Sequence, residues 1–145
     1  MTARIARFRQ PRIPEKVEQA NGVALLRSLG GRAWVLGTRR RRGDHQGTMQ
    51  TPGIPDVWAF LPPPRYKSPL DGKMPASPKG CGLWWEAKAE DGRRSPMQEL
   101  FANCCADCDV AYVVGTLDDL FKFLIDGGWL LADNVAYYRR EHMKG

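Results

Sequence analysis

Histidine is scarce in this sequence, and most of its cysteines are crowded into one short segment. The two histidines and four cysteines are His45, His142, Cys81, Cys104, Cys105 and Cys108. A structural zinc site needs about four Cys or His ligands, usually supplied as paired clusters. Three of these cysteines instead share helical spacing, which suits packing on one helix better than a disulfide. The sequence therefore favours reduced, half-buried thiols over a zinc centre.

Long apolar runs are also missing. No segment approaches the length of about 20 apolar residues that a membrane helix needs. The basic residues 1–12 are not followed by the apolar stretch of a secretory signal. We therefore expect a cytoplasmic protein that does not associate with membranes. If the protein comes from a bacterium or a phage, we expect it to be associated with the nucleoid. The 145 residues suit one compact domain.

The net charge of +6 is concentrated in the first third of the chain. Residues 1–48 contain eleven Lys and Arg against three Asp and Glu, and the remainder contains eleven against thirteen. Such a basic segment is typical of proteins that bind a polyanion, although a solvated charged surface has the same composition. The arginines that we expect to contact phosphate groups are Arg39, Arg40, Arg41, Arg42, Arg93 and Arg94.

Hydrophobic periodicity and breaker residues divide the chain into helices and strands. The pattern predicts helices over residues 15–29, 96–108 and 117–126, and strands over residues 33–36, 56–61, 83–89 and 110–114. The second helix should bury one face that includes Met97, Leu100 and the clustered cysteines. The last strand should be buried on both faces. This order, αβββαβα, predicts an α/β domain over residues 14–128, between a basic arm (1–13) and a C-terminal extension (129–145).

The third predicted strand contains two charged residues in an otherwise apolar, aromatic segment. A period of two places Glu86 and Lys88 on the same face of this strand. Burying unpaired charge is costly, so a buried carboxylate and ammonium would need partners. Two interpretations stay open from this segment alone: a functional site, or a solvated face on which the two charges pair weakly.

Asp56 stands at the start of the second predicted strand, behind a Gly-Ile-Pro turn. If this strand pairs with the strand of Glu86, two carboxylates and a lysine converge. Two carboxylate ligands are what Mg²⁺ requires from a protein, with waters and phosphate oxygens completing its octahedron. The alternative is that Asp56 only caps the preceding turn.

These residues carry a resemblance to a known family. Pro55-Asp56 followed by Glu86-Ala87-Lys88 resembles the signature of the PD-(D/E)xK nucleases. The Asp-Gly-Arg-Arg-Ser-Pro-Met-Gln sequence of residues 91–98 and the Glu-containing first helix make the chain similar to a VRR-NUC domain, over residues 15–124. The resemblance implies a restriction-endonuclease-like core, with a mixed four-stranded sheet flanked by helices.

The resemblance also implies residue roles. Asp56, Glu86 and the main-chain carbonyl of Ala87 would ligate Mg²⁺ or Mn²⁺, and Lys88 would orient the attacking water. Gln98 would point back toward the site from the start of its helix.

Two of these side chains have open alternatives. A capping box competes for the side chain of Gln98. The carboxylate of the first helix is expected to be Glu18, because it aligns with Leu25 and Leu29, and Glu15 is the alternative. An ordinary surface charge is a further alternative for either glutamate.

The implied function is a metal-dependent, structure-selective DNA endonuclease. A chain with one site and no room for a base-reading domain must gain selectivity from the geometry of branched DNA, so we expect a homodimer and a Holliday-junction resolvase. The alternatives are a flap- or nick-processing nuclease and a non-catalytic DNA-binding module. Residues 62–80, rich in Pro, Lys and Gly, would form either a substrate-contacting flap or a variable loop.

Overall fold

A computed structural model describes residues 13–36, 53–75, 79–89 and 92–143. The helices and strands, in chain order, are α1 (Glu15–Ser28), β1 (Arg32–Val35), β2 (Val57–Leu61), β3 (Cys81–Ala87), α2 (Pro96–Asp107), β4 (Ala111–Gly115), α3 (Leu117–Asp126), the 3-10 helix η1 (Ala132–Asn134) and α4 (Val135–His142). The predicted order αβββαβα is present up to α3, and the strand ends differ from the prediction by one or two residues. The helical elements η1 and α4 were not predicted.

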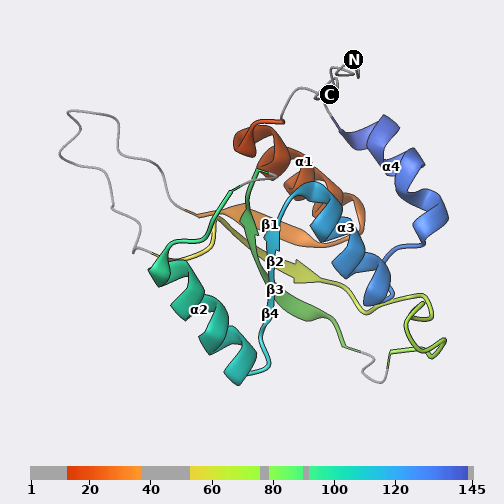
Figure 1. The fold of residues 1–145 in the computed structure, drawn as a ribbon. Helices are drawn as coiled ribbons and strands as arrows, with labels where there is room; N and C mark the ends of the chain where they lie inside the picture. The colour runs from red at the N-terminus through yellow and green to blue at the C-terminus, as the bar shows by residue number, and fades with distance from the viewer. Residues whose placement is uncertain (1–12, 37–52, 76–78, 90–91, 144–145) are drawn as a thin grey trace, which may run out of the picture.

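The four described strands form one mixed sheet in the order β1-β2-β3-β4 (Figure 1). β1 and β3 both pair antiparallel with β2, and β4 pairs parallel with β3. Parallel pairing requires a crossover connection, which α2 supplies. The expected mixed four-stranded sheet with flanking helices is therefore present.

The two faces of the sheet differ sharply. Val57, Ala59, Leu83 and Trp85 alternate along β2 and β3 on one face, and all of them are fully buried. That face packs against the apolar sides of α1 and α3 in a single core. The other face carries aromatic rings that are only partly covered, and α2 packs on it where Phe101 meets the ring of Trp84.

Two burial predictions are wrong. Only Cys105 of α2 is buried, while Met97 and Leu100 are about half exposed and Cys104 and Cys108 are exposed. The last strand, β4, ends the strand order of the described sheet, and Val113 is its only buried residue. Both errors have one cause: α2 lies over one side of the aromatic face and does not enclose it, so helical periodicity overestimates burial.

The segment after α3 packs onto the domain. Leu130 belongs to the hydrophobic core, and α4 contacts α1. The indole nitrogen of Trp129 donates a hydrogen bond to the carbonyl oxygen of Pro62 at 2.6 Å, which ties this segment to the loop after β2. No helix in the described part of the chain combines the length and apolar character needed to cross a bilayer.

Candidate metal centre

Three carboxylates meet at one end of the sheet. Glu15, Asp56 and Glu86 each offer an oxygen atom, and these atoms all lie within 4.8 Å of one another. Glu15 lies in the first turn of α1, Asp56 immediately precedes β2, and Glu86 is near the end of β3. The register explains the convergence, because Val57 pairs with Trp85 and the next step of each strand places Asp56 beside Glu86.

The loop before β2 holds Asp56 in place. Gly53 adopts a φ of 89°, and a Cβ atom there would lie 2.6 Å from the carbonyl oxygen of Met97. Only glycine therefore allows this loop to pack against the first turn of α2. Pro55 is fully buried, and the carbonyl oxygen of Asp56 accepts a hydrogen bond from the amide of Leu36 at 2.7 Å. The Asp56 backbone is thus fixed between β1 and α2.

Glu86 is the most buried charged residue of the described chain, with 2% of its surface exposed. Its Oε1 accepts a hydrogen bond from Nε2 of Gln98 at 2.7 Å. Its Oε2 is buried and has no hydrogen-bond partner of acceptable geometry among the described residues. Burial raises the pKa of Glu86 to about 7, the charge of Asp56 adds to the rise, and the charge of Lys88 opposes it. A buried carboxylate oxygen without a partner is costly unless a cation or a proton binds it.

Gln98 uses both ends of its side-chain amide. The backbone amide of Ser95 donates to Oε1 of Gln98 at 2.8 Å, and the amide of Gln98 donates to the hydroxyl of Ser95 at 3.2 Å, which completes a capping box. The Nε2 group simultaneously donates to Glu86. The expected competition between the cap and the site is therefore wrong, because an amide is a donor and an acceptor at once. Gln98 couples the start of α2 to the orientation of Glu86.

Lys88 lies on the same face as Glu86, as the strand period predicts. Its Nζ atom is 3.6 Å from Oε1 of Glu86, and its side chain is 15% exposed. The ammonium group is therefore close to the carboxylates and still reachable from solvent. Ala87, between these two residues, is fully buried at the end of β3. Its carbonyl stays a predicted ligand.

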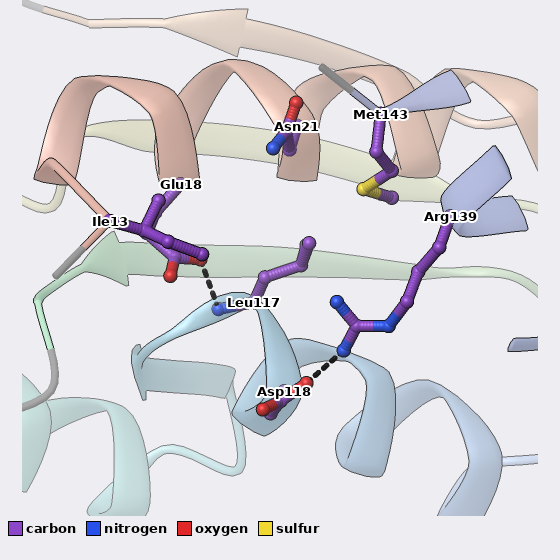
Figure 2. Close-up of a pocket in the computed structure, with 7 residues that line it drawn as sticks. All are labelled: Ile13, Glu18, Asn21, Leu117, Asp118, Arg139 and Met143. Atoms are coloured by element: carbon purple, nitrogen blue, oxygen red, sulfur yellow. Dashed lines mark hydrogen bonds and ion pairs between the residues drawn. The ribbon is translucent and has the colours of Figure 1, made fainter. Parts of the chain in front are cut away.

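The structure corrects the choice between the two glutamates of α1. Glu15, the alternative, joins the carboxylate cluster, whereas Glu18 does not. Oε2 of Glu18 accepts a hydrogen bond from the amide of Leu117 at 2.7 Å, at the start of α3 (Figure 2). The alignment of Glu18 with Leu25 correctly indicated an inward side chain, since Glu18 is 6% exposed. It could not reveal that the inward neighbour is α3.

Glu18 also borders a cavity of about 250 Å³ between α1, α3 and α4. Figure 2 shows Asn21 of α1 and Met143, just after α4, on the same cavity. Arg139 of α4 pairs with Asp118 of α3 at its rim and stacks over the ring of Phe121, 4.9 Å from the ring centroid. We interpret this region as the packing junction of the three helices.

The two glutamates form a natural matched pair for a test. Glu18→Ala should lower the free energy of unfolding by about 2 kcal/mol, because it removes a buried, charge-assisted hydrogen bond to an orphan amide of α3. Glu15→Ala should change that free energy by less than about 0.5 kcal/mol, because the loss of a favourable charge at the start of α1 is offset by relief of the repulsion from Asp56 and Glu86. It should instead weaken Mn²⁺ binding. Urea unfolding in EDTA and calorimetric titration with Mn²⁺ measure the two effects, and the reversed pattern would restore Glu18 to the site.

Sequence analysis missed Tyr112. It pairs with Trp84 across β3 and β4, so it shares the face of Glu86, and its hydroxyl is buried. Burial raises the pKa of Tyr112 and the charge of Glu86 raises it further, while Arg94 lowers it. Tyr112 therefore belongs to the electrostatic environment of the centre. The sequence alone does not give the register between β3 and β4, so nothing marked this tyrosine.

The predicted phosphate-binding arginines fall into two groups. Arg93 and Arg94 are exposed just before α2, whose first turn adjoins the carboxylates. Residues 39–42 lie outside the described residues. The described residues of loop 62–80 begin at the end of β2 opposite Asp56, and Figure 1 shows them and the start of α2 at opposite ends of the sheet. The flap interpretation of this loop therefore has no support from its described residues.

A scan of protein-family models finds no match to the chain, and searches of curated proteins and of solved structures find no match either.

Proposed function

We propose that this protein is a Mg²⁺- or Mn²⁺-dependent DNA endonuclease of the VRR-NUC type, with its active site at the carboxylate cluster. One observation carries the proposal: Glu86 is only 2% exposed, and its carboxylate lies within 4.8 Å of those of Asp56 and Glu15. A group held in this state has a strongly perturbed pKa and a specific set of charged neighbours, which is typical of functional sites.

The donor set fits a hard divalent cation. Asp56, Glu86 and Glu15 would hold it through oxygen atoms, with the carbonyl of Ala87 as a further ligand. Carboxylate and carbonyl oxygens select Mg²⁺ or Mn²⁺ over Zn²⁺, and no cysteine or histidine belongs to the described cluster. When bound, such an ion stabilises negative charge on a phosphate and lowers the pKa of a coordinated water.

The neighbouring side chains have complementary roles. Lys88, 3.6 Å from Glu86, places an ammonium group where it can orient a water and offset the charge that develops on the phosphate. Gln98 fixes one oxygen of Glu86 and so restricts the orientation of its carboxylate. Catalysis requires such groups to be held close to their productive geometry before substrate arrives.

Two groups of arginines support DNA as the substrate. Arg93 and Arg94 are exposed beside the start of α2, and the run Arg39–Arg42 precedes Asp56 in the sequence. Arginines of this kind contact phosphates and position DNA without reading its sequence. We therefore propose selectivity for DNA structure, with branched DNA as the substrate. A homodimer acting as a junction resolvase is the specific form, because a two-fold pair of sites matches a two-fold junction.

The test is cleavage of end-labelled single-stranded, duplex, flap and four-way DNA, with Mg²⁺, with Mn²⁺ and with EDTA. We expect cleavage only with a divalent ion, and none by Asp56→Asn. The matched control is Asp133→Asn, an exposed aspartate in η1, which should cut as the wild type does. Light scattering on the four-way junction reports the stoichiometry, and a strict monomer would remove the resolvase form while leaving a flap or nick nuclease. Cleavage that persists in Asp56→Asn would contradict the assigned site.

A further inference from the structure

The face of the sheet opposite the core carries a row of aromatic rings that begins at the metal centre. Successive rings along it contact one another, with centroids 4.5 to 6.3 Å apart. We call this set the aromatic row: Trp34, Phe60, Trp58, Trp84, Phe101 and Tyr112. A strand rises about 3.3 Å per residue, so Trp58 and Trp84 stand about 7 Å along their strands from Asp56 and Glu86, on the same face.

Only one side of the aromatic row is covered. Phe101 of α2 packs edge-on against Trp84, and α2 packs onto β4. On β1 and β2, Trp34 remains 44% exposed and Phe60 50% exposed. The ring of Trp58 lies over Gly82, since a Cβ atom there would come within 2.6 Å of the indole. Glycine at position 82 thus leaves room for the indole of Trp58, which lies beside the two exposed rings.

Positive charge accompanies the exposed side. Arg32 pairs with Phe60 across β1 and β2, and its side chain is exposed on the face of the aromatic row. A hollow of about 290 Å³ next to Trp34 is lined by Arg27 and Arg32. Apart from Glu86 at the metal centre, no described strand residue on this face is acidic. Exposed rings beside positive charge are characteristic of surfaces that bind single-stranded nucleic acid.

We propose that the aromatic row binds the unpaired bases of a single-stranded segment whose backbone enters the metal centre. This proposal rests on the proposed nuclease function and narrows its substrate to DNA that has unpaired nucleotides beside the cut phosphate. Bases stack on Trp34 and Phe60 and Arg32 contacts the phosphates that follow, while Arg27 adds positive charge at the β1 edge, where it lines the hollow with Arg32. A second copy of the chain fits less well, because a two-fold contact would bring Arg32 against the same positively charged surface of the other copy.

The test measures binding without cleavage. Fluorescence anisotropy of a labelled 15-nucleotide single strand and of a duplex of the same length, both in EDTA, separates binding from catalysis. Trp34→Ala and Phe60→Ala should each weaken single-strand binding roughly five- to a hundredfold, the range expected for loss of one stacked base. Duplex binding should stay within about twofold. Trp34→Phe should retain most of the affinity, because it retains a ring.

Tyr137→Ala is the matched control, since Tyr137 is 51% exposed but lies on α4, away from the aromatic row. The Tyr137→Ala variant should bind both the single strand and the duplex with the affinity of the wild type. Equal weakening of single-strand and duplex binding by Trp34→Ala would overturn the stacking role. Unchanged binding with a shift in sedimentation from dimer to monomer would assign this face to a second copy of the chain. If these variants weaken single-strand binding as expected but the protein shows no metal-dependent cleavage, the single-strand-binding surface stands and the proposed nuclease function is rejected.

Discussion

Glu86→Gln should abolish metal-dependent DNA cleavage, with a loss of about a thousandfold or more in rate, equivalent to about 4 kcal/mol of transition-state stabilisation. The substitution keeps the shape of the side chain and the oxygen that accepts the hydrogen bond from Gln98. It removes the negative charge that Glu86 contributes to the carboxylate cluster and, with it, the ion pair with Lys88. Steady-state cleavage of a labelled flap substrate measures the effect, and DNA binding in EDTA should be unchanged.

The same substitution should abolish cleavage but stabilise the folded protein at high pH. The pKa of Glu86 is about 7 in the folded protein without metal, against 4.5 for the exposed group. The folded state therefore binds a proton more tightly than the unfolded state does. The contribution of Glu86 to stability is complete below pH 4.5, falls as the pH rises to 7 and is constant above it. Glu86→Gln should lack this loss and be more stable than the wild type at pH 8.

Urea unfolding at pH 5 and pH 8 in EDTA measures this difference, which should be on the order of 2 kcal/mol. Glu141→Gln is the control, because Glu141 is exposed on α4 and should leave the pH profile unchanged. Added Mn²⁺ should stabilise the wild type more at pH 8 than at pH 5, since the ion competes with a proton for Glu86. Identical pH dependences of stability for the wild type and Glu86→Gln would show that Glu86 is not a buried carboxyl group with a raised pKa.

The sequence predicted that Glu86 and Lys88 share a face, and that Asp56 approaches them if its strand pairs with theirs, because both follow from the period of a strand. It favoured Glu18 over Glu15, whereas Glu15 joins the cluster, because that choice depends on how α1 crosses the sheet. The angle is fixed by packing: Gly22 contacts the ring of Trp85 so closely that any Cβ atom would collide with it. Gly22, which lowers the helix propensity of its segment, is therefore needed for the packing of α1 against Trp85.

The aromatic row could not be recognised from the sequence for a related reason. In the sequence, the three tryptophans of β2 and β3 look like core residues, and one of them is. Trp85 is fully buried, while its neighbour Trp84 lies on the opposite face among partly exposed rings. Strand alternation assigns the two to different faces, but only the position of α2 shows which face stays open. Composition alone cannot separate a ring that fills a core from one that remains available for a ligand.

Lys88→Ala should reduce turnover about a hundredfold or more while leaving metal binding intact, since an ammonium group is not a ligand of a cation. The proximity of Lys88 to Glu86 gives it two effects that must be separated. Its charge lowers the pKa of Glu86, so the variant should hold a proton on Glu86 to a higher pH. At neutral pH that proton would itself weaken metal binding and imitate the loss of a ligand.

The measurement therefore belongs above the pKa that Glu86 has in the variant, which is reached by repeating the titration at increasing pH until the Mn²⁺ affinity stops changing. There, calorimetry should give a Mn²⁺ affinity for Lys88→Ala equal to that of the wild type or higher, because a positive charge has been removed beside the cation. Single-turnover cleavage at saturating Mn²⁺ should still be slow, since the water has lost its orienting group. Lys122→Ala, an exposed lysine on α3, is the control for general loss of charge. Loss of Mn²⁺ binding at this pH with the fold preserved would mean that Lys88 holds the carboxylates in place and does not act on the water.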